Sequence, residues 1–211
     1  MILDIINLVQ SRWDFFAELL LEHLQISMVS ILAAIAAGLL LGTVISEFPK
    51  SSKTVMGLVN FIYTIPSISL LGFLIPLSGL GDITAVIALT VYALLPMVRN
   101  TYTGLTNISP LLAEAAVGMG STRMQVLLKI KLPLAMPVII AGVRNMAVMT
   151  IALAGIASFI GAGGLGVAIY RGITTNNKTM TIIGSLLIAV LAVSVDVLIG
   201  CVEKKVSRHK V

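Results

Sequence analysis

Long apolar runs separated by short polar segments dominate the chain. Charge-poor stretches cover residues 24–46, 55–77, 83–103, 134–159 and 179–202. An α-helix needs roughly 20 apolar residues to cross a hydrocarbon core about 30 Å thick, and each stretch meets this length. The pattern therefore predicts an all-α, polytopic membrane protein with five transmembrane helices.

The segment before the first run has a different character. It carries five charged residues: Asp4, Arg12, Asp14, Glu18 and Glu22. It lacks the basic start and long apolar stretch of a signal peptide. Apolar residues recur in it at helix-like spacing, at Leu8, Trp13, Phe16 and Leu20. We expect an interfacial amphipathic helix over residues 1–23 and a transmembrane domain over residues 24–211. The alternative is that residues 1–23 are only the polar start of the first span.

The composition excludes a soluble protein and offers no catalytic set. Hydrophobic residues make up 58% of the chain and charged residues 11%, whereas a soluble domain carries about 25% charged residues. The single cysteine, Cys201, matches no metal-ligand spacing, and the two histidines, His23 and His209, lie at opposite ends of the sequence. No GxxxxGK[ST] phosphate-binding loop is present. The sequence predicts a protein that is not an enzyme and binds neither metal nor cofactor itself.

Positive charge is distributed unevenly between the two sides of the membrane. Five spans place the termini on opposite sides, and one side then holds eleven of the fourteen Lys and Arg residues: Lys50, Lys53, Arg99, Arg123, Lys129, Lys131, Arg144, Lys204, Lys205, Arg208 and Lys210. Cytoplasmic loops are the ones enriched in Lys and Arg. We therefore expect an external N-terminus, a cytoplasmic C-terminus and a cytoplasmic segment 109–133. This distribution accounts for the net charge of +5 without nucleic acid as a partner.

The cytoplasmic segment 109–133 has its own helix signals. Ser109 can cap a helix, and Gly120 suits the left-handed residue that follows a helix end. Ser121 can then cap a second short helix over residues 122–131. The proline two residues beyond this helix marks the return to the membrane. The pattern predicts two short helices around a glycine turn.

The same segment resembles the EAA motif of ABC importer permeases. Glu114-Ala115-Ala116, three residues, Gly120, nine residues, Ile130, one residue and Leu132-Pro133 match the motif at each signature position. The resemblance implies the type I ABC importer permease fold (MetI-like), in which this loop is a coupling helix seated on a separate ATP-hydrolysing subunit.

Roles and partners follow from this resemblance by position. Glu114, Ala115, Ala116 and Gly120 are expected to dock to the ATPase, and Ile130, Leu132 and Pro133 to anchor the return of the loop to the bilayer. ATP and Mg are expected on the ATPase, with none on this chain. The resemblance also implies an extracellular substrate-binding protein, a second permease (an identical or a sister chain) and surrounding membrane lipid as partners.

Two further stretches resemble the permeases of osmoprotectant importers for glycine betaine, carnitine and choline. They are NFIYTIPSISLLGFLIPLSGLGD and VMTIALAGIASFIGAGGLGVAIYRGI. This resemblance implies a bacterial cytoplasmic membrane protein that carries a quaternary-amine compatible solute. The alternative within the same machinery is an amino acid such as methionine. A secondary transporter predicts paired internal repeats with broken helices, which the sequence does not display.

Candidate gating residues are a proline and a glycine cluster. Pro66 is expected to bend the second span. Gly161, Gly163, Gly164 and Gly166 match GxGxxG, but they follow a membrane span on the outer side instead of a strand, which excludes a dinucleotide site. We expect these glycines to shape an outer gate by letting the backbone approach neighbouring helices. Ordinary span packing and a tight turn are the alternative interpretation.

Two charged residues lie inside predicted spans. Arg144 lies about ten residues into the fourth span, roughly 15 Å deep at 1.5 Å per residue, and Asp196 lies at a similar depth in the fifth. Intramembrane charges are candidates for a translocation path. We expect Arg144 and Asp196 to pair or to share a polar network. Snorkelling of Arg144 to the headgroups and a position of Asp196 near water are the alternatives.

Overall fold

The structure, a computed structural model, describes residues 2–208. Met1 and residues 209–211, which include Lys210 of the predicted cytoplasmic tail, lie outside the described residues. The longest helices are α2 (Trp13–Glu47), α5 (Asp82–Thr106), α8 (Leu132–Ala157) and α10 (Lys178–Arg208). The shorter elements are α1 (Ile2–Ser11), α3 (Pro49–Tyr63), α4 (Ser67–Ser78), α6 (Pro110–Gly118), α7 (Arg123–Val126), a π-helical turn (Leu127–Lys131), a 3-10 turn (Ser158–Ile160) and α9 (Gly166–Thr174). Residues 2–208 contain no strand, which confirms the all-α fold.

Within residues 2–208, four helices are long and apolar enough to span a membrane, and the bent pair α3–α4 makes a fifth if it counts as one span. The second span is broken, not merely bent. Its two halves meet at 96°, and Pro66 is the residue that caps α4. Proline lacks an N–H and disfavours helical geometry in the residue before it. The predicted single helix over residues 55–77 is therefore replaced by two half-helices.

The first span begins earlier than the sequence pattern suggested. The N-terminal helix ends at Ser11 instead of residue 23, and α2 is continuous from Trp13 onward. Arg12 leaves helical geometry with φ −130° and ψ 35°. No glycine or proline interrupts residues 13–37, so nothing in this stretch opposes a continuous helix. The apolar side of α1 packs beside Phe16 and Leu19 of α2.

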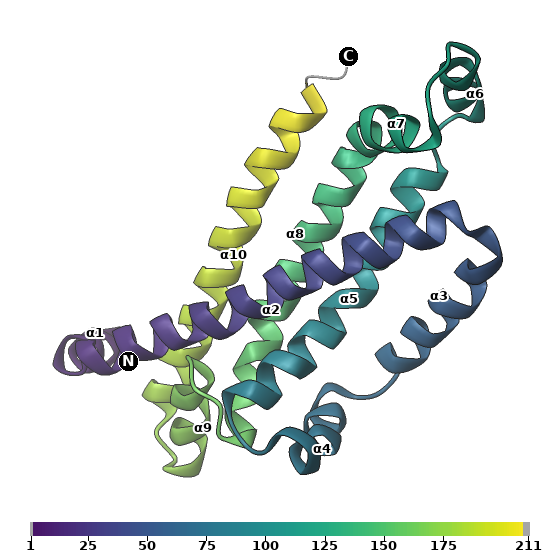
Figure 1. The fold of residues 1–211 in the computed structure, drawn as a ribbon. Coiled ribbons are helices and arrows are strands. Elements are labelled where there is room, and N and C mark those ends of the chain that lie inside the picture. Colours follow the sequence, from purple (N-terminus) through teal and green to yellow (C-terminus); the bar gives the residue numbers. More distant parts are fainter. Residues whose placement is uncertain (1, 209–211) are drawn as a thin grey trace.

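The core is formed where α2 crosses α5 and α8, with α10 packed on α8 and α9 (Figure 1). Small residues make this crossing close. A Cβ on Gly38 would lie 2.6 Å from the Met97 side chain, and one on Gly42 would lie 2.6 Å from Thr101. Glycine permits this approach of helix backbones.

Most functional candidates lie at one of two ends of the bundle (Figure 1), and Pro66, Arg144 and Asp196 lie elsewhere. The "α6 end" comprises α6, α7, the π-helical turn and the C-terminal parts of α2 and α10. The "α9 end" comprises the glycine loop (residues 161–166), α9, the start of α5 and the N-terminal half of α2.

Candidate functional site

At the α6 end, the predicted glycine cap is present. Gly120 has φ +91°, the left-handed region that favours glycine. The Ser121 N–H donates to the Ala116 carbonyl at 3.0 Å, and the Gly120 N–H donates to the Val117 carbonyl at 2.9 Å. These two bonds are the Schellman pattern that satisfies carbonyls at a helix end. The cap stops α6 and turns the chain sharply into α7.

The surface of α6 is open. Glu114, Ala115 and Gly120 are exposed and Ala116 is buried. Ser109 occupies the position before α6, but its side chain makes no capping bond, so this part of the capping prediction is wrong. α6 projects beyond the bundle (Figure 1).

Thr122, not Ser121, caps the next helix. The Gln125 N–H donates to Thr122 Oγ1 at 3.3 Å, and the Thr122 N–H donates to Gln125 Oε1 at 2.8 Å. This reciprocal pair is a capping box. The sequence carried its signal, a Thr followed three residues later by Gln, which our reading overlooked in favour of Ser121.

The second short helix is not separate from the membrane span. Residues Arg123–Ile160 form one continuous helical stretch, and the Leu132 N–H donates to the Leu127 carbonyl five residues earlier. The exposed Pro133 lies in the first turn of α8. Proline removes a hydrogen bond and crowds the preceding turn, and a π-helical turn directly before it accommodates both effects. The prediction that Pro133 separates the short helix from the membrane span is therefore wrong, because the helix continues through it.

The other two anchor candidates lie along this continuous helix. Ile130 is half-buried in the π-helical turn. Leu132 packs against the core cluster that includes Leu127 and Ala135. α7, the π-helical turn and α8 therefore form one continuous helical connection from α6 into the core.

An ion pair ties this connection to the first span. Lys131 Nζ lies 2.7 Å from Glu47 Oε1, with side-chain exposures of 25% and 29%. Glu47 is the last residue of α2. Lys131 is the unspecified residue between Ile130 and Leu132 in the EAA-like pattern. The pair borders a cavity of about 340 Å³ under α6, lined in part by Ala113 and Val117. The sequence reading missed this pair because its partners are 84 residues apart.

Between the two ends, Arg144 joins α8 to α10. Its Nε and Nη2 donate to the two carboxylate oxygens of Asp196 at 2.6 Å and 2.7 Å, which confirms the expected pairing. Its Nη1 also donates to Glu203 at 3.2 Å. A Cβ on Gly200 would lie 3.2 Å from the guanidinium carbon. The guanidinium therefore rests on the glycine between two carboxylates.

The sequence reading identified Arg144 and Asp196 and missed Glu203. Residues seven apart lie on the same side of a helix, two turns from one another. The spacing of Asp196 and Glu203 could therefore have indicated the third member.

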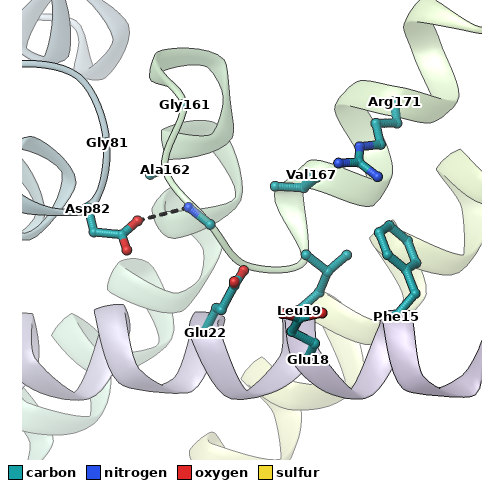
Figure 2. A pocket seen from close by; sticks show the side chains of 11 residues that line it. Phe15, Glu18, Leu19, Glu22, Gly81, Asp82, Gly161, Ala162, Val167 and Arg171 are labelled. Carbon is teal, nitrogen blue, oxygen red and sulfur yellow. Dashed lines mark hydrogen bonds between the residues drawn. The ribbon is translucent and has the colours of Figure 1, made fainter.

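At the α9 end, two carboxylates from different helices hold the glycine loop. The Gly163 N–H donates to Asp82 Oδ1 at 2.9 Å, and the Gly164 N–H donates to Glu22 Oε2 at 2.8 Å. Figure 2 shows Glu22 pointing up from α2 toward the loop and Asp82 reaching the loop from the left. The sequence reading did not assign either acid.

Close packing explains the glycines of this loop. A Cβ on Gly163 would lie 2.5 Å from Glu22 Oε2, and one on Gly166 would lie 2.0 Å from the Gly155 carbonyl oxygen. Gly164 has φ +94° and lies against His23. Gly161, with φ +79°, ends the 3-10 turn. The loop backbone thus approaches α2 and α8 closely, as the glycine pattern predicted.

A cavity of about 600 Å³ opens beside the loop. Its acidic groups are those of Glu18, Glu22 and Asp82. Arg171, a residue of α9, lines the other side of the cavity (Figure 2). The Arg171 guanidinium is 5.3 Å from the centre of the Phe15 ring, a cation–π distance. The cavity borders both carboxylates that hold the loop.

Pro66 lies apart from the α6 end, the Arg144 cluster and the glycine loop. The carbonyl before it, that of Ile65, accepts a hydrogen bond from the Tyr92 hydroxyl on α5. The rings of Tyr63 and Tyr92 meet edge to face with centroids 5.7 Å apart. The structure therefore distributes the predicted residues over the α6 end, the Arg144 cluster, the broken span and the α9 end.

Within residues 2–208, no group of three or more His, Cys, Asp or Glu side chains is placed to hold a metal ion.

Comparisons with known proteins identify the family of the chain. The family model described as "Binding-protein-dependent transport system inner membrane component" matches residues 30–208. The choline transport system permease protein OpuBB of Bacillus subtilis (strain 168) is 38% identical over 88% of this chain and 86% of that protein. The carnitine transport permease protein OpuCD of Listeria monocytogenes is 38% identical over 98% and 93%.

A solved structure extends the agreement to the fold. A chain of the MetNI methionine ABC transporter in inward-facing conformations superposes with a TM-score of 0.84 at 26% identity, covering 92% of this chain and 97% of that one. The open α6 segment, the membrane-spanning helices and the similarity along almost the whole sequence agree with one another. The chain belongs to the family of binding-protein-dependent transport system inner membrane components, the permease subunits of ABC importers, which work with separate ATPase and substrate-binding partners.

Proposed function

We propose that this inner-membrane permease carries a quaternary-amine compatible solute such as glycine betaine, carnitine or choline. One observation carries the proposal: relatives named for choline and carnitine transport are 38% identical over most of their length. The methionine transporter chain is only 26% identical.

Substrate selection is assigned chiefly to the substrate-binding partner. Quaternary amines are commonly held by cages of several aromatic rings. Tyr63 and Tyr92 form an edge-to-face pair. Trp13 is exposed at the far N-terminal end of α2. Phe15–Phe16 and Phe159–Tyr170 are further pairs among the described residues. Each pair has fewer rings than a cage needs, which supports a partner as the place of selection.

The α6 end is proposed to be cytoplasmic and to receive the ATPase, on which ATP and Mg bind. This places the N-terminus outside and the C-terminus in the cytoplasm. The exposed Glu114 and Ala115 are offered to the partner together with exposed Leu111 and Met119 on or beside α6. Movement of α6 passes through the continuous helix around Ile130, Leu132 and Pro133 into the core.

The translocation path is proposed to run beside α8 and α10, with the glycine loop as the outer gate and the break at Pro66 as a hinge. Intramembrane charges rarely face lipid. The side chains of Arg144 and Asp196 are 35% and 38% exposed in the single chain. A second permease, identical or a sister chain, would cover them together with the water-filled path.

Reconstitution tests this function. The permease, its ATPase and its binding protein are placed in liposomes, and ATP hydrolysis and uptake are measured with glycine betaine, carnitine, choline and methionine. Stimulation of both activities by one of the three quaternary amines supports the proposal. Stimulation by methionine alone would replace it with the amino-acid alternative.

A further inference from the structure

We infer that Glu22 and Asp82 are positioning residues that clamp the glycine loop (residues 161–166) shut, and that this clamp opens in each transport cycle. The inference rests on the proposed role of the loop as the outer gate. It assigns the closing force to two acids that lie far from the loop in sequence, 142 and 81 residues away.

The geometry is that of a clamp with two arms. Successive backbone amides, those of Gly163 and Gly164, donate to the carboxylates of Asp82 and Glu22. Hydrogen bonds to an ionised acceptor are stronger than those between neutral groups. The two acids come from α5 and α2, whereas the loop connects α8 to α9. Any shift of α8 against α2 or α5 therefore changes at least one of these bonds.

The inner side of the loop is packed against the core, although Ala162 also borders the cavity beside the loop. Ala162 is only 2% exposed and packs with Ile26 and Ala85. Beneath Gly164, His23 is fully buried, with its Nε2 3.0 Å from the Ile151 carbonyl. Opening of the loop would expose this packed layer, so the exposure of Ala162 reports the state of the clamp.

The clamp can be released because both of its carboxylates border an open cavity. The cavity of about 600 Å³ borders both carboxylates, so water can replace the amide donors when the loop moves. Glu18 lines the same cavity one helical turn before Glu22, and no hydrogen bond joins it to the loop. Glu18 therefore provides a matched control for the loss of negative charge alone.

The test measures access to Ala162, the buried residue on the inner side of the loop. Ala162→Cys is introduced together with Cys201→Ser, because Cys201 is exposed. The assembled complex is placed in nanodiscs and labelled with a polar maleimide, without nucleotide and with ATP plus vanadate. In the parent we expect slow labelling that rises at least about fivefold when nucleotide is trapped. Glu22→Ala or Asp82→Ala should raise the nucleotide-free rate about tenfold, as the loss of one charge-assisted hydrogen bond allows.

Conservative variants separate clamping from folding. Glu22→Gln and Asp82→Asn keep a carbonyl acceptor, so they should stay within about threefold of the parent labelling rate. Glu18→Ala should leave the rate unchanged. Glu22→Ala should also lower solute transported per ATP hydrolysed while the complex still assembles, measured by gel filtration.

Two results would overturn the inference. One is equal labelling in Glu22→Ala, Asp82→Ala and Glu18→Ala, which would reduce the acids to ordinary solvated charges. The other is parent labelling that does not respond to nucleotide, which would make the loop a static turn. Neither outcome depends on which solute the permease carries, because labelling is measured without solute.

Discussion

The two ends of this permease differ in how their functional segments are held. At the α6 end, a short helix projects from the bundle, bears exposed apolar residues and lies over a cavity of about 340 Å³. At the α9 end, a loop of similar brevity is bound by Glu22 and Asp82 and packed on buried His23. One segment leaves a surface for another protein to complete, while the other is completed by the chain itself. Substitutions at the two ends should therefore fail in different ways.

The largest effect is expected from Gly120→Val at the α6 end. Gly120 has φ +91°, and left-handed geometry costs a residue with a side chain about 1–2 kcal/mol, more when it is β-branched. The Schellman cap should be lost and α6 misdirected, so uptake should fall by at least about tenfold while membrane insertion is retained. Uptake is measured in proteoliposomes, insertion by recovery of the variant in the membrane fraction, and ATPase binding by pull-down.

The control for this prediction lies two residues away. Gly118 is the last residue of α6, and a Cβ there meets nothing within 4 Å. Gly118→Ala should keep uptake within about twofold of the parent, because alanine favours a helix. Normal uptake by Gly120→Val would contradict a coupling role for the glycine turn.

A contrasting failure is expected from Gly164→Ala at the α9 end. The new Cβ would lie 3.0 Å from His23 Nδ1 at a residue with φ +94°. The loop should therefore move away from His23, because left-handed geometry costs alanine about 1 kcal/mol. Solute transported per ATP should fall several-fold, while ATPase binding is unchanged. Parallel assays of uptake and ATP hydrolysis measure the ratio. Loss of ATPase binding in this variant would remove the distinction between the two ends.

The ion pair Glu47–Lys131 allows the α6 end to be tested by charge reversal. Lys131→Glu replaces the cation that now lies 2.7 Å from Glu47 Oε1 with a second acid. It should lower uptake about threefold, since partly exposed pairs contribute only about 0.2–1 kcal/mol. The double variant Glu47→Lys/Lys131→Glu should restore uptake. Lys129→Glu, an exposed change in the same π-helical turn, is the matched control. If the double variant is no better than the single one, the pair does not tie α2 to the connection.

The sequence predicted the local chemistry of both ends better than their connections. The glycine cap at Gly120 was predictable because a helix end is decided by a few neighbouring residues. The return to the membrane was misread at Pro133, because a π-helical turn carries the helix through the proline. Such a turn has no simple residue signature. Its presence makes α7 and α8 one continuous helix, which the sequence alone did not suggest.

Long-range partners were the least predictable part of the site. The glycine loop indicated close backbone approach, but not that Glu22 and Asp82 would meet it, because both acids lie in polar flanks of predicted spans. The break at Pro66 was located correctly, whereas its 96° angle depends on contacts such as Tyr92 with Ile65. Arg144 and Asp196 were paired correctly because charge inside a span has few partners available.

The smallest effect is expected between the two ends, from Gly200→Ala under the Arg144 guanidinium. The added Cβ would lie 3.2 Å from the guanidinium carbon, so the arginine must shift by a few tenths of an ångström while keeping Asp196. We expect a fall of about 2 °C in the midpoint of thermal unfolding, consistent with a loss of under 1 kcal/mol in a chain of this size, and nearly normal uptake. Gly57→Ala, where a Cβ meets nothing within 4 Å, should not lower the midpoint. A large loss of uptake in Gly200→Ala would mean that Arg144 moves relative to Gly200 during transport. The cluster that joins α8 and α10 would then matter more for transport than the difference between the two ends.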